Sequence, residues 1–110
     1  MTAALLALLL SLGIFTTRDV VREMAVSAGV SPRLAACVVS YESGWNATEI
    51  STSNAQGLWQ IKPETAAWAA GKLGMAHWDL LDPIDNTTLG LYILQTFPEW
   101  YLVIDICTGD

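Results

Sequence analysis

The stretch YESGWNATEISTSNAQGLWQIKPETAAW, from Tyr41 to Trp68, contains the features that decide the fold. Glu42 stands near its start, at the end of an apolar helical pattern, and glycines, hydroxyls, amides and indoles dominate the residues that follow. Burial disfavours the ionised form of a carboxylic acid, so a charge at the edge of an apolar segment is either poorly tolerated or used for chemistry. The position of Glu42 therefore raises the question of what this carboxylate does.

The residues before Glu42 predict two short helices. The first has Thr17 as its N-cap, runs through residues 18–28 and is followed by a glycine of the kind that ends helices. The second follows at once, with Ser31 as N-cap and Pro32 at the first helical position, and it places Glu42 in its last turn at the edge of the apolar stripe. The inward faces are expected to carry Val20, Val21, Met24 and Ala28 in the first helix and Leu34, Cys37, Val38 and Tyr41 in the second.

The residues after Glu42 predict a polar loop and two more helices. No helical period continues through residues 44–61, which are rich in turn-forming residues. Pro63 begins a third helix, and Asp82 caps a fourth, with Pro83 in its first turn and Asp85 at the capping-box position. The tail from Pro98 fits either a helix or a strand. The pattern predicts one mainly α domain, with at most a short β element between the helix that carries Glu42 and the next helix.

Composition and charge exclude several classes of function. The chain has 110 residues, which is within the range of one small domain. Its net charge is −6 and it has no block of Lys or Arg, which argues against nucleic acid and anionic lipid headgroups as partners. His77 is the only histidine and the two cysteines lie far apart, so we expect no metal site and no cofactor. For Cys37 and Cys107 we predict two buried free thiols, with a disulfide as the alternative.

The first 16 residues form a distinct apolar segment. MTAALLALLLSLGIF carries no charge up to Phe15. It has the length of a signal-peptide core, but it is shorter than the roughly 20 apolar residues needed to cross a bilayer. It also lacks the basic residues that usually precede such a core. Because of its length and apolar character, we nevertheless expect residues 1–16 to act as an export signal or membrane anchor. An unusually apolar first helix or a misplaced gene start are the alternatives.

Two features of the second helix predict a raised pKa for Glu42. Apolar surroundings disfavour the carboxylate, and the last turn of a helix faces the negative end of the helix dipole. A carboxylic acid that stays protonated near neutral pH is what a glycosidase needs to protonate a departing sugar oxygen. From helix position alone, a solvated glutamate at a fraying helix end is the commoner explanation.

The loop after Glu42 favours the interpretation as a sugar site. Ser51 offers a hydroxyl, Gly57 leaves room for close backbone approach, Trp59 offers a stacking face and Gln60 offers an amide. Carbohydrates are bound by this mixture of aromatic faces, amides and hydroxyls. We therefore predict that these four residues bind the substrate.

Three motifs together, ESGWN, STSNAQGLWQIKPETA and DPIDNTTLGLYIL, resemble the soluble lytic transglycosylase domain of the lysozyme-like superfamily. The resemblance runs without a gap from Glu42 to Ala66 and covers roughly residues 31–94. It implies a lysozyme-like fold in which Glu42 is the catalytic acid/base, Ser51 lies beside it and Gln60 lines the sugar groove. Trp59 stands where the family usually has Met.

The resemblance also implies a reaction, the cleavage of the bond between N-acetylmuramic acid and N-acetylglucosamine in peptidoglycan. A single Glu protonates the leaving oxygen and then takes the proton of the C6 hydroxyl, which closes an anhydro ring without water. This explains how one carboxylate suffices where hydrolytic glycosidases usually pair two.

The C-terminus departs from the family pattern. The family's domain continues into an Ala-Tyr-Asn-Ala-Gly block, whose Tyr helps position the catalytic group, and this chain stops at CTGD near where that block would begin. Tyr92 and Tyr101 are present but stand outside that motif. We therefore expect the transglycosylase domain, residues 17–110, to be incomplete at its C-terminus and marginally stable.

Two alternatives to an active transglycosylase stay open. One is a hydrolase on the same fold that adds water in place of the internal hydroxyl. The other is an inactive, truncated module that binds glycan strands. All three interpretations name peptidoglycan as the partner and place the protein in the cell envelope, periplasmic or extracellular, or in a virion if the gene belongs to a phage.

Overall fold

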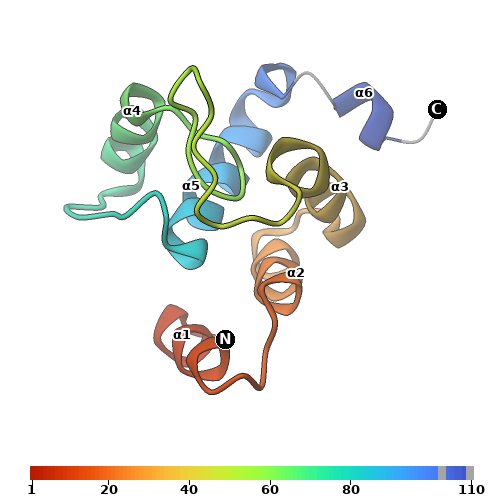
Figure 1. Ribbon diagram of the computed structural model, residues 1–110, viewed down its shortest axis with the longest axis vertical. Helices are drawn as coiled ribbons and strands as arrows, with labels where there is room; N and C mark the ends of the chain where they lie inside the picture. Colours follow the sequence, from red (N-terminus) through yellow and green to blue (C-terminus); the bar gives the residue numbers. More distant parts are fainter. Residues whose placement is uncertain (102–103, 109–110) are drawn as a thin grey trace.

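The computed structural model describes residues 1–101 and 104–108 (Figure 1). It is mainly helical, as the sequence predicts, and α5 runs through the middle of the molecule, packed against α1, α2, α4 and the short turn η1. The elements are α1 (Ala3–Ser11), α2 (Thr17–Ala28), α3 (Pro32–Ser43), α4 (Pro63–Leu73), α5 (Pro83–Thr96), the 3₁₀ turn η1 (Pro98–Trp100) and α6 (Ile104–Cys107).

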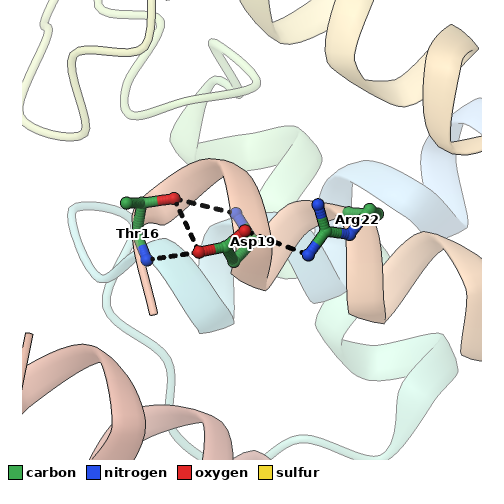
Figure 2. Close-up of polar contacts among 3 residues, drawn as sticks. All are labelled: Thr16, Asp19 and Arg22. Carbon is green, nitrogen blue, oxygen red and sulfur yellow. Dashed lines mark hydrogen bonds and ion pairs between the residues drawn. The ribbon is translucent and has the colours of Figure 1, made fainter. Parts of the chain in front are cut away.

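The start of α2 is one residue earlier than the sequence pattern indicates. Thr16, not Thr17, is the N-cap, and it forms a capping box with Asp19. The Thr16 hydroxyl accepts from the Asp19 backbone N–H at 3.2 Å, and Asp19 Oδ2 accepts from the Thr16 backbone N–H at 2.9 Å (Figure 2). The box satisfies two backbone donors that a helix end otherwise leaves free.

The predicted starts of α3 and α5 are confirmed. Ser31 caps α3 by accepting from the Leu34 N–H, and Asp82 caps α5 by accepting from the Asp85 N–H, each with Pro at the first helical position. Asp85 itself does not complete a capping box, because its carboxylate accepts from the Asp79 N–H at 2.9 Å. It ties the preceding loop to the start of α5.

The core forms where α2, α3, α4 and α5 meet the loop between α3 and α4. Trp59 is its largest fully buried side chain. The predicted apolar face of α3 is partly wrong, because Tyr41 is 59% exposed and Leu34 is only partly buried, while Ala35 and Val39 are buried. The main cluster consists of Val21, Ala25, Ala35, Val38, Val39, Leu58, Trp59, Ile61, Ala66, Ala69, Ala70, Leu80, Leu89, Leu91, Ile93, Leu94 and Tyr101.

The β content of the described residues is limited to isolated bridges, between Ile50 and Gln56 and between Gln56 and Ile61. These bridges lie between α3 and α4, where the sequence predicts at most a short β element. The mainly α fold class with at most a short β element, predicted from the sequence, is therefore confirmed.

The N-terminal segment folds as a helix on the outside of the bundle. Leu6 of α1 packs with Val20 and Ile84 in a second, smaller cluster. Within the part of the chain that the structure describes, no helix has both the length and the apolar character needed to cross a bilayer. Several large apolar side chains of this segment are exposed: Met1, Leu5, Leu8, Leu12 and Ile14.

The prediction of two free thiols is wrong. Cys37 of α3 and Cys107 of α6 form a disulfide, with their Cα atoms 5.5 Å apart. They are separated by 70 residues in sequence, but the chain passes α5 and turns back, so that α6 lies against α3 (Figure 1). Sequence spacing alone does not reveal this return.

Candidate functional site

Glu42 lies in the last turn of α3, half-buried, two residues before Gly44 ends the helix in the left-handed conformation. Burial raises the pKa of this carboxyl above its usual range. The direction of this shift agrees with the sequence-based prediction. The group therefore keeps its proton to a higher pH than an ordinary surface glutamate does.

Gln60 holds together the loop that follows this helix end. Its backbone has a positive φ of 51°, and its side-chain Nε2 donates to the Gly57 carbonyl at 2.9 Å and to the Glu49 carbonyl at 3.2 Å. Both amide hydrogens are thus directed at the loop's own backbone. The side-chain oxygen, as an acceptor, is the part of Gln60 suited to a ligand hydroxyl or amide.

Ser51 lies in a tight turn of the same loop. Its hydroxyl oxygen accepts from the Ala55 N–H at 3.0 Å and lies 3.1 Å from the Ser53 hydroxyl, while its backbone N–H donates to the Ala55 carbonyl. The turn fixes the position of the partly buried Ser51 side chain.

Trp59 and Gly57 do not have the surface positions that their predicted roles require. The indole of Trp59 is fully buried, so it has no face free to stack on a sugar. Its Nε1 donates to the Thr87 hydroxyl at 3.2 Å, and its ring covers Gly90 so closely that any side chain at that position would overlap it. Gly57 is also buried, and a Cβ there would meet Asn86 and the Leu80 carbonyl. Both residues serve the packing of the loop.

Asn86 of α5 also fixes the loop, and the sequence motifs alone do not assign it a role. Its Oδ1 accepts from the Trp59 N–H at 2.8 Å, and its Nδ2 donates to the carbonyls of Gln56 at 2.9 Å and Leu80 at 2.8 Å. This fully buried side chain directs both of its amide hydrogens and its oxygen at the backbone. The asparagine in DPIDN is the sequence signal that indicates it.

Tyr101 is a site residue that the sequence analysis did not assign. It follows η1, is 5% exposed, and meets the Trp59 ring edge-on at 5.8 Å between centroids. Burial raises the pKa of its phenol far above the ordinary value, and the neighbouring charge of Glu42 raises it further. The phenol therefore stays protonated, so it remains a hydrogen-bond donor within the electrostatic range of the Glu42 carboxyl.

A pocket of about 400 Å³ opens beside Gln60 and Tyr101. Tyr101 and Gln60 both line it, and Tyr101 connects it to Glu42 through the electrostatic interaction described above. Among the described residues there is no cluster of three His, Cys, Asp or Glu side chains suited to a metal ion. The lining consists of Gln60, Ile61, Lys62, Thr65, Ile93, Glu99 and Tyr101.

The structure thus brings Glu42, Tyr101 and Gln60 to one region, with Ser51 in the loop that Gln60 holds. A carboxyl that keeps its proton to a higher pH than usual can act as a general acid toward an oxygen bound nearby. No second carboxylate is required for such a step if the nucleophile comes from the substrate itself.

The fold is similar to that of the 70 kDa soluble lytic transglycosylase from Escherichia coli, whose crystal structure aligns with a TM-score of 0.66 at 26% sequence identity. The alignment covers 76% of this chain and 14% of the larger protein. The class is therefore that of the lysozyme-like transglycosylase domains. The family model described as the transglycosylase SLT domain matches residues 19–103, and the chain belongs to this family.

Two curated relatives match a shorter stretch. Both are described as endo-type membrane-bound lytic murein transglycosylase A, from Cronobacter sakazakii at 58% identity and from an Enterobacter species at 55% identity, each over 38 residues. Each match covers 34% of this chain and 19% of the relative. The aligned part is thus about a fifth of the length of these relatives.

Proposed function

We propose that this protein is a peptidoglycan lytic transglycosylase in which Glu42 is the single acid/base. The proposal rests on the half-buried carboxyl of Glu42, whose pKa is raised by burial and which interacts electrostatically with the buried Tyr101, on the scaffold of this family. The names of the relatives, lytic murein transglycosylases, support the same reaction class.

In the proposed reaction, protonated Glu42 gives its proton to the glycosidic oxygen between N-acetylmuramic acid and N-acetylglucosamine. The C–O bond breaks, and the N-acetyl group of the muramic residue assists at the anomeric carbon. The carboxylate of Glu42 then takes the proton of the C6 hydroxyl, whose oxygen closes the 1,6-anhydro ring. Glu42 ends protonated as it began, and no water is consumed.

The buried environment of Glu42 supports the first step, because burial favours the neutral acid that must donate the proton. Tyr101 supports the second, since a protonated phenol close by can hold the carboxylate in place once it forms. We assign Gln60 and Ser51 to the binding of the sugar chain, through the Gln60 side-chain oxygen and the loop that carries Ser51. Trp59 and Gly57 shape that loop from inside the core.

The disulfide between Cys37 and Cys107 supports a location outside the cytoplasm, in the cell envelope, because such bonds persist in oxidising compartments. The exposed apolar side chains of α1 suit membrane attachment of the N-terminal segment.

The products of digestion test the proposed reaction. Purified peptidoglycan is incubated with the protein and the released muropeptides are analysed by mass spectrometry. We expect 1,6-anhydro ends, each product lighter by one water than the corresponding reducing muropeptide. A digest that contains only reducing ends would assign the protein to the hydrolases, and no release at all by the folded protein would support a module that only binds glycan.

A further inference from the structure

A separate pocket, of about 330 Å³, lies between α1, α2, α4 and α5, the helices labelled in Figure 1. It shares no lining residue with the pocket beside Gln60 and Tyr101. On α5 the two pockets use different faces of a helix with about 3.6 residues per turn, since Leu91 and Gln95 line this one and Ile93 lines the other. Its volume is within the range of about 300–1,000 Å³ that small-molecule sites have, and the proposed reaction does not use it.

The wall of this pocket is apolar and adaptable. Leu6 of α1 and Leu91 of α5 are buried in it. Met24 of α2 lines the same pocket, and its unbranched thioether side chain can adjust to occupants of different shape. Met1 and Leu73 are exposed and continue the apolar lining to the surface. The wall therefore suits an alkyl chain, which would leave water by binding there.

Three polar side chains of the lining offer hydrogen-bond acceptors. Gln95 Nε2 donates to the Ala28 carbonyl at 2.9 Å, which leaves the side-chain oxygen of Gln95 as an acceptor. The Thr88 hydroxyl gives its hydrogen to the Ile84 carbonyl at 2.8 Å, so its oxygen can only accept. The carboxylate of Glu23 is an acceptor by its nature. The polar part of a matching ligand is therefore a group that donates several hydrogen bonds.

Glu23 also decides the sign of the charge that the pocket accepts. It is the one charged side chain among the described residues that line the pocket, and it is only partly exposed. Its carboxylate forms no ion pair within the described part of the chain, not even with the amino group of Met1, which lines the same pocket. An unpaired carboxylate beside an apolar wall attracts a cation and repels an anion.

We infer that this pocket is a binding site for a small amphiphile with one alkyl chain and a primary amine at its head. The alkyl chain lies against the apolar wall that includes Met24 and Leu91. The ammonium head has three N–H donors and a positive charge, and it meets the carboxylate of Glu23 and the acceptor oxygen of Gln95. This site goes beyond the proposed function and does not depend on it.

The test is a titration of the whole chain with decylamine, decanol and decanoate, followed by NMR of isotope-labelled methionine methyl groups. The protein has three methionines, of which Met1 and Met24 line the pocket and Met75 does not, so that Met75 is an internal reference. We expect decylamine to shift the signals of Met1 and Met24 and to leave that of Met75 unchanged. At low ionic strength it should bind about tenfold more tightly than decanoate, with decanol between them, and added salt should reduce this preference.

Two matched pairs of variants separate the pocket from the general charge and surface of the protein. Glu23→Gln should reduce the preference for decylamine over decanoate to about twofold or less. Glu64→Gln, which removes a negative charge at an exposed position of α4 outside the lining, should leave the preference intact. Ser27→Trp, at an exposed position of the lining, should block all three ligands, whereas Val26→Trp, exposed and outside the lining, should block none. Thermal melting checks that each variant is folded.

The inference is overturned if no ligand shifts the Met24 signal, if Met75 shifts as much as Met24, or if decylamine and decanoate bind equally. An equal loss of preference in Glu64→Gln, or blocked binding in Val26→Trp, would also overturn it. Tighter binding of a short-chain phosphatidylethanolamine than of decylamine would assign the pocket to phospholipids instead, since its phosphate adds a negative charge next to the amine. None of these measurements involves lysis, so failure of this site and failure of the proposed function are separate results.

Discussion

The loop after α3 and the C-terminal segment that carries Tyr101 are held by different kinds of interaction. The loop between α3 and α4 is fixed by buried hydrogen bonds, mainly from Asn86 to the backbone of residues 56–59, and by the buried Trp59. The C-terminal segment that carries Tyr101 has one aromatic contact with Trp59, and it has the disulfide from α6 to α3. The loop and Tyr101 are part of the core, whereas α6 has no fully buried residue and is linked to α3 by one covalent bond.

This difference indicates how the site is kept in place. A loop held by many cooperative contacts opens only when the core opens, whereas a short segment such as η1–α6 opens locally unless it is tied down. The Cys37–Cys107 bond links the helix of the candidate acid to the segment of the tyrosine beside it. We therefore expect changes in the loop to affect global stability and changes in the tail to affect the site first.

The largest effect on stability is expected at the loop. Trp59→Ala removes a fully buried indole and leaves a cavity against Gly90 and Thr87, so the free energy of unfolding should fall by about 3–5 kcal/mol. Urea denaturation followed by circular dichroism measures it. Tyr41→Ala is the control, since that side chain is 59% exposed and should change stability by about 0.5 kcal/mol or less. Equal losses in the two variants would contradict the burial of Trp59.

The next effect concerns the tail. Cys37→Ala with Cys107→Ala opens a loop closed across 70 residues of sequence, so the free energy of unfolding should fall by about 2–5 kcal/mol. Lysis should fall at temperatures where the variant is still folded, because the disulfide no longer holds the segment of Tyr101 to the helix of Glu42. Dithiothreitol should reproduce both changes in the wild-type protein and have no effect on the double variant. Full lytic activity in the folded double variant would show that the tail does not need the bond.

The smallest effect concerns the pH dependence of stability at Glu42. Its folded-state pKa is raised by burial above the ordinary value of 4.5. The stability associated with the protonated group is therefore present below that value and is lost as pH rises through the folded-state pKa. Glu42→Gln should have a higher melting temperature than the wild-type protein at pH 7, and the difference should shrink toward pH 4. A difference independent of pH would contradict the raised pKa.

The sequence predicts the fold well where local signals determine structure. The caps at Ser31 and Asp82 and the glycines at positions 29 and 44 set helix ends through a few neighbouring residues, so they are readable without tertiary information. The exposure of Tyr41 and the full burial of Trp59 are not readable in this way, because they depend on which elements cover each face. The partial burial of Leu34 has the same cause.

In the candidate site, too, some features follow from the local sequence and others depend on distant contacts. The position of Glu42 and the direction of its pKa shift follow from its place on α3. The role of Tyr101 and the pairing of Cys37 with Cys107 do not, since both arise from the return of the chain after α5, which no local pattern indicates. The function of Asn86 is also long-range, because its partners lie up to 30 residues away in sequence.

The most direct test of Glu42 as the acid/base is lysis of purified peptidoglycan by Glu42→Gln, compared with wild-type protein at the same concentration. The substitution keeps the shape of the side chain and removes the proton that it must donate. We expect the rate to fall by about 10²–10⁴-fold while the melting temperature at pH 7 stays at or above that of the wild type. Lysis by Glu42→Gln close to the wild-type rate would contradict the assignment of Glu42 as the acid/base.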